Sequence, residues 1–526
     1  MTTKPESRTA PDLLAEMARR HPEAEAVVDG GLRWSYATLH AEARAAAKGL
    51  SALGVARGDR VAILMGNRAE WLSVEFGAMM LGAIAVALNT WASGAELAHQ
   101  LADSGTRVIV LEPRHRDTDL LQRVREARAT TELPALEHVV VVDPEEAFAD
   151  VVDHDEMLLA GTAIEEADIA EAEARVRPED PACLLYTSGS TALPKGVPLH
   201  HRGLIDNMWE IGERQHLGPH DRLWLAVSLF WSFGGVNAVF ALLTHGGAIV
   251  LQPHFDAGRA LRLIERERCS VFYGTPNMAL AMHEHPERAS RDLSSLRTGV
   301  TIGTPEQVMR IVELGAGEIC NAYGLTEAFG NSAVTDCRMA LERRIACSGP
   351  PLGGVELRIV DPESEVPRAV GEVGEIRVMG NLMAGYWNDP ARTAEAFDGE
   401  GFHKTGDLGV LDEAGNLVFR GRLKEMVKTG GINVAPAEVE DALRRHEDVE
   451  LAFVTGLPDD RLDEALAAVI VPRGDARPDE NALKAHCRER LAAYKVPRHF
   501  RFVEASALPL TSTGKLEKRR LPELFG

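Results

Sequence analysis

The sequence predicts an α/β protein with a large N-terminal domain of alternating helices and sheets, a β subdomain, and a small α+β domain at the C-terminus. Three observations support this prediction. At 526 residues, the chain is too long for one ordinary hydrophobic core. Its first part alternates short apolar runs with helical patterns, which is typical of parallel or mixed sheets covered on both faces. From Pro350 onward, glycine and proline become dense and short strand patterns follow one another.

The N-terminal elements follow from hydrophobic periodicity. Apolar residues recur at helical spacing over residues 36–53, and Gly54 supplies a helix stop. The most apolar stretch, residues 76–88, is too short to span a membrane and predicts a buried helix that runs into a strand. Buried strands are expected at residues 61–65, 108–111, 139–142, 224–227, 248–251 and 271–273.

The rest of the chain divides into a connection, a β subdomain and a C-terminal domain. Residues 143–180 are rich in Asp, Glu and Ala, which predicts a solvated helix-and-loop connection. The β subdomain is expected to contain strands at residues 356–360, 374–378 and 417–419. We place the domain boundary at Lys424, where a compact α+β pattern begins. The predicted domains are therefore residues 1–423 and 424–526.

Composition narrows the class of protein. The net charge of -22 disfavours binding to nucleic acid or to an anionic membrane through general electrostatics. The polar N-terminus lacks the apolar core of a signal peptide. The 6 cysteines are scattered, without a C-x-x-C pair or a metal-ligand spacing, so we expect buried, reduced thiols in a cytoplasmic protein. The sequence leaves the oligomeric state open, with a homodimer among the possibilities.

Residues 186–196, Tyr-Thr-Ser-Gly-Ser-Thr-Ala-Leu-Pro-Lys-Gly, carry the strongest local signal and follow an apolar run. A loop that offers backbone N–H groups, hydroxyls and an ammonium group has the donors that a polyphosphate requires. The spacing of a Walker A loop is absent. On local composition alone, a Ser/Thr-rich surface loop is a serious alternative.

Three further segments favour a nucleotide site. The first, residues 321–328, offers an aromatic ring, a hydroxyl and a carboxylate. The second, residues 405–408, reads Thr-Gly-Asp-Leu and precedes the basic segment 421–428. The third, residues 509–516, reads Pro-Leu-Thr-Ser-Thr-Gly-Lys-Leu. In this order and at these separations, the motifs resemble the adenylate-forming superfamily. That superfamily contains acyl-CoA synthetases, firefly-type luciferases and peptide-synthetase adenylation domains. The resemblance covers nearly the whole chain.

The resemblance implies a role for each motif. The loop should hold the β- and γ-phosphates of ATP through Thr187, Ser188, Gly189, Ser190, Thr191 and Lys195. The rest of the nucleotide should be bound by Tyr323, Gly303 and Thr304 at adenine, by Asp407 and Arg422 at ribose, and by Thr326 at the α-phosphate. Glu327 should hold Mg²⁺, and Lys515 should bridge the substrate carboxylate and the α-phosphate. Lys424 matches the hinge of a mobile C-terminal domain, and Gly430 and Gly431 match the approach to the CoA channel.

These roles describe an ATP-dependent carboxylic acid:CoA ligase that forms an acyl-adenylate and then an acyl-CoA, with ATP, Mg²⁺ and coenzyme A. The family builds its acyl pocket from segments that here supply Trp231, Phe233, Gly235, Asn237, Phe329 and Gly330. Aromatic rings beside glycines predict an apolar slot for an aromatic or medium-chain monocarboxylic acid. Ala192 and Ile302 replace usual glycines, and Trp231 stands where many acyl-CoA ligases have His.

Other functions remain open at this stage. An adenylate-forming enzyme with a non-CoA acceptor, such as an amine ligase or a diazotase-like enzyme that activates a small oxyanion, shares these motifs. A luciferase-like oxidase shares them as well. A catalytically dead nucleotide-binding protein is the alternative that the departures at Ala192 and Ile302 suggest.

Overall fold

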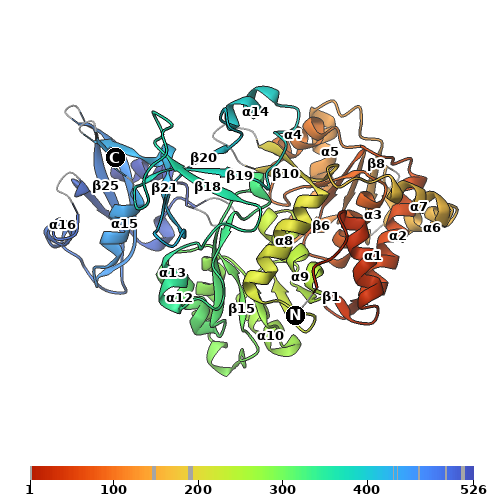
Figure 1. Ribbon diagram of the computed structural model, residues 1–526, viewed down its shortest axis with the longest axis horizontal. Helices are drawn as coiled ribbons and strands as arrows, with labels where there is room; N and C mark the ends of the chain where they lie inside the picture. The colour runs from red at the N-terminus through yellow and green to blue at the C-terminus, as the bar shows by residue number, and fades with distance from the viewer. Residues whose placement is uncertain are drawn as a thin grey trace. The chain divides into compact units, whose positions relative to one another are not determined.

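The computed structural model describes residues 3–144, 150–187, 194–429, 432–434, 436–459, 462–491, 495–510 and 516–526. The chain forms two compact units (Figure 1). The N-terminal unit comprises Met1–Leu357, Val378–His403 and Ala414–Leu417, and the C-terminal unit comprises Arg358–Arg377, Lys404–Glu413 and Val418–Gly526. In the described part of the chain, no helix combines the length and the apolar character that crossing a bilayer requires.

Two large sheets organise the N-terminal unit. One has eight strands in the order β17 (Ala333–Val334), β16 (Glu318–Tyr323), β15 (Thr298–Thr301), β14 (Val271–Tyr273), β12 (Arg222–Leu225), β13 (Ala248–Leu251), β1 (Glu25–Asp29) and β2 (Leu32–Ser35). The other has seven strands in the order β11 (Lys195–His200), β10 (Pro181–Thr187), β4 (Ile84–Ala87), β3 (Arg60–Leu64), β5 (Val108–Leu111), β8 (His138–Val141) and β9 (Val152–Asp153).

Helices cover both faces of each sheet. The layer between the two sheets contains α1 (Ala10–Arg20), α2 (Tyr36–Ala52), α3 (Ala69–Met80), α8 (His201–Gln215) and α9 (Val239–His245). The outer face of the seven-stranded sheet packs against α4 (Gly94–Ser104) and α5 (Leu120–Thr130). The outer face of the eight-stranded sheet packs against α10 (Ala257–Glu267), α11 (Pro276–His283) and α12 (Pro305–Leu314). This arrangement confirms the predicted class, parallel or mixed sheets covered on both faces, since the inner strands pair parallel and β2, β11 and β17 pair antiparallel at the edges.

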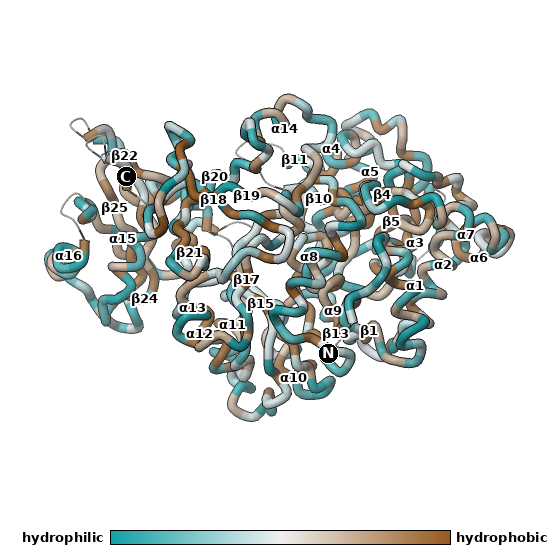
Figure 2. The backbone as a smooth tube through the Cα atoms, in the orientation of Figure 1, coloured by the Kyte–Doolittle hydropathy of each residue, from teal (hydrophilic) through white to brown (hydrophobic). Residues whose placement is uncertain are grey.

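Strand β5 shows why its sequence is apolar throughout. Val108 and Val110 pack into the layer between the sheets, whereas Ile109 and Leu111 pack against α4 and α5. Because successive side chains of a strand point to opposite faces, a strand buried on both sides requires four apolar residues in a row. Figure 2 shows this strand in the hydrophobic colour, whereas the colour alternates along the amphipathic helix α10.

The predicted helices and the acidic connection are also found. Helix α2 begins after Ser35, whose side chain accepts a hydrogen bond from the Thr38 N–H, and Gly54 follows its end with φ 82°. The apolar stretch 76–88 is the end of α3 followed by β4. The acidic connection contains α6 (His154–Gly161) and α7 (Glu166–Ala174), and α7 buries only Ile169.

Two smaller sheets lie mainly in the C-terminal unit. The first has the order β18 (Glu356–Val360), β19 (Gly374–Met379), β20 (His403–Leu411) and β21 (Leu417–Arg422). The second has the order β23 (Ile432–Val434), β22 (Val427–Thr429), β25 (Asp463–Pro472) and β24 (Val449–Asp459), with β26 (His499–Phe502) paired to β25. The helices α15 (Pro436–Arg444) and α16 (Glu480–Arg488) bury Leu443 and Leu483 against the second sheet.

The cysteines behave as the composition predicted. Cys183, Cys269, Cys320, Cys337, Cys347 and Cys487 are all buried, and none of them forms a disulfide. Buried free thiols of this kind act as small apolar side chains.

Candidate active site

Three polar side chains meet in the N-terminal unit. Lys195, at the start of β11, places Nζ 2.7 Å from Oε1 of Glu327. The hydroxyl of Tyr386 donates a hydrogen bond to the same Oε1 at 2.8 Å and accepts one from Lys195. Lys195 and Glu327 come from two of the predicted motifs, 132 residues apart. The structure therefore joins the end of the predicted phosphate loop to the predicted magnesium residue.

Backbone hydrogen bonds hold Tyr386 in this place. The N–H of Met383 donates to the carbonyl of Glu327 at 2.8 Å, and the N–H of Trp387 donates to the carbonyl of Gly196 at 2.9 Å. Residues 383–387 are thus fixed to both motifs. A Cβ atom on Gly196 would lie 2.9 Å from Cβ of Trp387, so the close approach of this segment requires glycine.

Electrostatics keep the Glu327 carboxyl ionised. Burial opposes its ionisation, but the charge and hydrogen bond of Lys195 and the nearby His403 outweigh burial and lower the pKa of Glu327. Burial and the negative Glu327 raise the pKa of Tyr386, so its hydroxyl keeps the proton that it donates. A buried carboxylate that accepts from both neighbours through Oε1 is suited to offer its other oxygen to a cation.

The hydroxyl of Thr326 faces a segment that the sequence assigned to the acyl pocket. Its Oγ1 lies 3.3 Å from Oγ of Ser232, the first residue of the π-helix η1 (Ser232–Ala238). π-Helical turns are rare and are frequent at functional sites. The predicted α-phosphate contact and the predicted acid-binding segment are therefore neighbours in space.

Four of the predicted pocket residues form a packed support. Nδ2 of Asn237 donates to the Phe329 carbonyl at 2.8 Å, and both side chains are 0% exposed. Gly330 has φ 92°, and a Cβ atom on it would lie 2.4 Å from Nδ2 of Asn237. A Cβ atom on Gly235 would lie 2.1 Å from the Leu229 carbonyl oxygen. These residues set the path of η1 and of the turn after Glu327 by close packing.

The remaining two pocket residues are aromatic and half-buried. The Trp231 ring lies edge-on to Trp91, with centroids 5.2 Å apart, and 5.6 Å from the ring of Phe230. The Phe233 ring lies 5.2 Å from that of Tyr273, at the end of β14. Edge-on and tilted aromatic contacts at these distances are favourable and fix the ring orientations.

The predicted adenine side lies at the ends of β15 and β16. Tyr323 is the last residue of β16 and is 5% exposed. The Asn321 side chain accepts a hydrogen bond from the Gly303 N–H and donates one to the Gly303 carbonyl, both at 3.2 Å. Thr304 precedes α12, and its N–H donates to Gln307 at 2.9 Å. Ile302, in the same segment, is 49% exposed.

The predicted ribose contacts pair within the C-terminal unit. Nε of Arg422, at the end of β21, lies 3.2 Å from Oδ1 of Asp407 in β20. The Asp407 N–H donates to Oγ1 of Thr405 at 3.0 Å. The Thr-Gly-Asp segment lies in β20 and the arginine ends β21, so the two motifs are on adjacent strands.

Several predicted site residues lie outside the described residues. These are Ser188, Gly189, Ser190, Thr191, Gly430, Gly431 and Lys515, together with Ala192. Lys424 lies in the short helix η4 (Leu423–Glu425). Thr187 ends β10, and its buried Oγ1 has no hydrogen-bond partner among the residues that the structure describes.

Sequence reasoning missed three residues that touch this site. Tyr386 follows Gly385 in a stretch without a recognised motif, and Ser232 lies in the predicted pocket segment but was not among the residues chosen from it. Trp91 follows β4, far in sequence from Trp231, and only packing reveals the contact. The local signal that could have identified Ser232 is its position as a polar residue between the predicted pocket residues Trp231 and Phe233.

Comparison with known proteins agrees with this geometry. The family model described as AMP-binding enzyme matches residues 14–387, and the model described as AMP-binding enzyme C-terminal domain matches residues 438–515. The chain belongs to the AMP-binding enzyme family. This membership confirms the resemblance to adenylate-forming enzymes that the sequence motifs suggested.

Relatives match along nearly their whole length. A feruloyl-CoA synthase of Amycolatopsis sp is 36% identical over 513 residues, which are 97% of this chain and 97% of that protein. The mitochondrial medium-chain acyl-CoA ligase ACSF2 of Danio rerio is 31% identical over 542 residues, covering 98% of this chain and 88% of that protein. The structure of the anthranilate CoA ligase AuaEII in complex with anthranoyl-AMP is 29% identical with a TM-score of 0.86, covering 98% of this chain and 96% of that one.

Proposed function

We propose that this protein is an ATP-dependent carboxylic acid:CoA ligase, which converts an acid to its acyl-adenylate and then to its acyl-CoA. The observation that carries the proposal is the contact of Lys195 and Tyr386 with Glu327, beside the Thr326–Ser232 pair. The relatives named as CoA ligases support the second half of the reaction. The predicted reaction class, an AMP-forming acid–thiol ligase, agrees with every one of these names.

In the first half-reaction, the substrate carboxylate attacks the α-phosphorus of ATP and pyrophosphate leaves. Negative charge builds on the phosphoryl oxygens, so positioned donors and cations lower the barrier. Thr326 would donate to the α-phosphate, and Lys195 would leave Glu327 to bind the departing phosphates. Lys515, which lies outside the described residues, would supply the cation between the carboxylate and the α-phosphate.

Glu327 is the residue that we propose for Mg²⁺. Mg²⁺ in nucleotide sites is held by one or two carboxylates together with substrate phosphates, and it neutralises phosphate charge when bound. The donor set fits, because Glu327 is 7% exposed with a lowered pKa and already faces the Lys195 ammonium group. The Lys195 ammonium group already places a positive charge beside Glu327, where we propose that Mg²⁺ binds.

The nucleoside would be bound by the residues that the sequence motifs predict for adenine and for ribose. Tyr323 would stack on adenine next to Gly303 and Thr304. Asp407 would accept hydrogen bonds from the ribose hydroxyls, with the Arg422 guanidinium 3.2 Å away to orient the carboxylate. A carboxylate is a usual partner of ribose hydroxyls because it accepts from both.

In the second half-reaction, the thiol of CoA attacks the acyl carbonyl and AMP leaves. We propose that the domain of residues 424–526 rotates about Lys424 between the two steps, withdraws Lys515 and opens the path for CoA near Gly430 and Gly431. Such a movement lets one active site serve two reactions in sequence. The resemblance to adenylate-forming enzymes supports this part of the proposal.

The acid would be aromatic or of medium chain length. Trp231 and Phe233 are the pocket residues whose rings remain partly exposed, and Ser232 between them faces Thr326. Asn237, Phe329, Gly235 and Gly330 would support these walls from behind. Flat, apolar walls favour a ring or a medium chain. Two of the named relatives, the feruloyl-CoA synthase and the anthranilate CoA ligase, carry aromatic acids in their names.

The test of the reaction is product analysis with ATP, CoA and a panel of acids. Formation of AMP and acyl-CoA in equal amounts is the expected result. AMP without a thioester would favour a non-CoA acceptor, and AMP with light emission in air would favour an oxidase. Absence of AMP with every acid would overturn the proposal.

The test of the pocket is a comparison of kcat/KM over acetate, hexanoate, decanoate, palmitate, benzoate and cinnamate. Cinnamate, benzoate or a medium-chain acid should rank first. Trp231→Ala should shift the ranking toward bulkier acids, because each methylene contributes about 1–3 kcal/mol of discrimination. Acetate or palmitate as the best substrate, or an unchanged ranking in the variant, would contradict the pocket assignment.

A further inference from the structure

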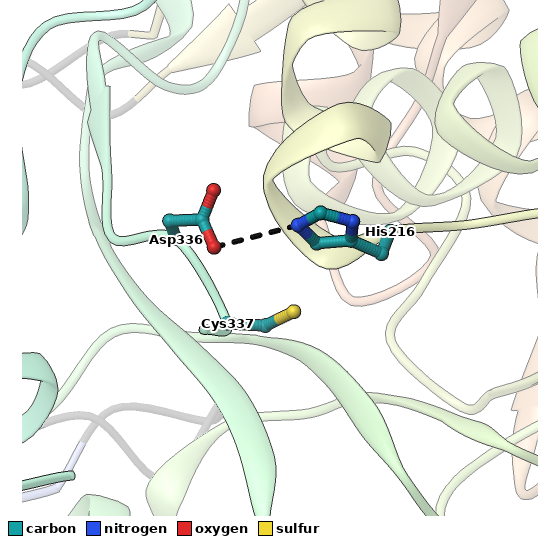
Figure 3. Close-up of side chains that lie close together, drawn as sticks. All are labelled: His216, Asp336 and Cys337. Carbon is teal, nitrogen blue, oxygen red and sulfur yellow. Dashed lines mark ion pairs between the residues drawn. The ribbon is translucent and has the colours of Figure 1, made fainter. Parts of the chain in front are cut away.

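Three potential metal ligands meet away from the adenylation site (Figure 3). His216 follows the last turn of α8, and Asp336 and Cys337 follow β17. One ligand atom of each residue lies within 4.8 Å of the other two. His216 is too far in sequence from Asp336 and Cys337 for any spacing motif, so the sequence predicted no metal cluster and only the fold reveals this one.

The separation of His216 and Asp336 suits a shared ion. Nε2 of His216 and Oδ1 of Asp336 are 3.5 Å apart, too far for a good hydrogen bond. Tetrahedral zinc has bonds of about 2.0–2.3 Å to nitrogen, oxygen and sulfur, so neighbouring ligand atoms stand about 3.3–3.6 Å apart. The two atoms already have this separation, and Sγ of Cys337 lies within 4.8 Å of both.

Burial and the position at a helix C-terminus also favour a cation. Nε2 of His216 is shielded from solvent and makes no hydrogen bond with any described residue, and Cys337 is 3% exposed. His216 caps the C-terminal end of a 15-residue helix, where the helix dipole is negative. Arg297 donates to the His216 carbonyl at 3.2 Å, which fixes the backbone at this position.

We propose that His216, Asp336 and Cys337 bind a divalent transition-metal ion, with zinc preferred. A thiolate, an imidazole and a carboxylate form a ligand set that selects Zn²⁺ over Mg²⁺, and a water molecule would complete the tetrahedron. The Cys337 thiol would lose its proton to solvent on binding. The ion would tie the end of α8 to the segment after β17, both of which belong to the scaffold around Tyr323 and Phe329.

The test is Co²⁺ titration of the metal-free full-length protein, without ATP and with a thiol-free reductant. We expect one Co²⁺ per chain with a thiolate-to-cobalt absorption band, and displacement of Co²⁺ by Zn²⁺. Cys337→Ser should abolish the band. His216→Asn should weaken Co²⁺ binding by at least about 10-fold, since it removes a ligand. Asparagine tolerates the φ of 52° at this position, so this variant keeps the fold.

The matched control is Cys487→Ser, which removes a buried cysteine of the C-terminal unit and should retain the band. Cobalt bound at Glu327 gives no thiolate band, so the two sites are distinguishable. Absence of the band in the wild-type protein would overturn the proposal. Its persistence in Cys337→Ser, or equal affinity in His216→Asn, would overturn it as well.

Discussion

Tyr386→Phe removes one hydroxyl from the proposed adenylation site and leaves the ring in place. The lost hydroxyl donates to Oε1 of Glu327 at 2.8 Å and accepts from Lys195. A hydrogen bond to a charged group contributes about 1.5–3 kcal/mol. Since about 1.4 kcal/mol corresponds to a factor of ten, adenylation should slow by about 10- to 150-fold. Tyr386 acts here as a positioning residue, because it orients Glu327.

The assay is ATP–pyrophosphate exchange over a range of Mg²⁺ concentrations. In the variant, the Mg²⁺ concentration for half-maximal rate should rise, because Glu327 is no longer held by two partners. Conversion of synthetic acyl-adenylate to acyl-CoA should stay within about twofold, since Mg²⁺ and pyrophosphate are not needed for that step. Exchange within twofold of wild type at every Mg²⁺ concentration would refute the reasoning.

The matched control for this experiment is Tyr36→Phe. The Tyr36 hydroxyl is fully buried and donates to the Gly247 carbonyl at 2.7 Å, in a part of the core without a predicted site residue. Its loss should lower Tm and leave the exchange rate and the Mg²⁺ dependence unchanged. A similar loss of exchange in both variants would mean that Tyr386 serves stability alone.

Three other changes have expected outcomes. Lys515→Ala should lower pyrophosphate exchange by at least about 100-fold and spare conversion of synthetic adenylate; equal losses in both assays would contradict its role. Lys424→Pro should spare exchange and block thioester formation, because proline fixes φ; wild-type rates would exclude Lys424 as the hinge. Burial raises the pKa of Glu75 from 4.5 to about 8 in the folded protein. Between these pH values the unfolded chain ionises first, so Tm should fall as pH rises, and it should fall less in Glu75→Gln. Parallel curves of Tm against pH for the two proteins would contradict this.

Much of the fold follows from local patterns. The buried strand β5 matches its predicted bounds because four consecutive apolar residues have few other places in an α/β protein. Helix α2 matches because Ser35 and Gly54 mark its ends. Strands β3 and β8 begin one residue before their predicted starts, at Arg60, which pairs with Ile84 of β4, and at His138, which pairs with Val108 of β5.

The arrangement of the site does not follow from local patterns. The motifs named Lys195 and Glu327, but only the fold shows that they touch before any ligand is bound. Tyr386 reaches them through backbone hydrogen bonds of its neighbours, which no side-chain pattern encodes. Asn237 was predicted as a pocket residue from its position in the segment, but its complete burial and its bond to the Phe329 carbonyl could be seen only in the fold.

The central claim, activation of an acid as its adenylate, is tested most directly by following oxygen from the acid. The acid is supplied with ¹⁸O in both carboxylate positions, together with ATP, Mg²⁺ and CoA, and the products are analysed by mass spectrometry. When a carboxylate oxygen attacks the α-phosphorus, that oxygen becomes bonded to phosphorus. It stays with AMP when the CoA thiol attacks the acyl carbon and AMP leaves. AMP should therefore carry one ¹⁸O and pyrophosphate none. Unlabelled AMP, or ADP with labelled phosphate, would contradict the account.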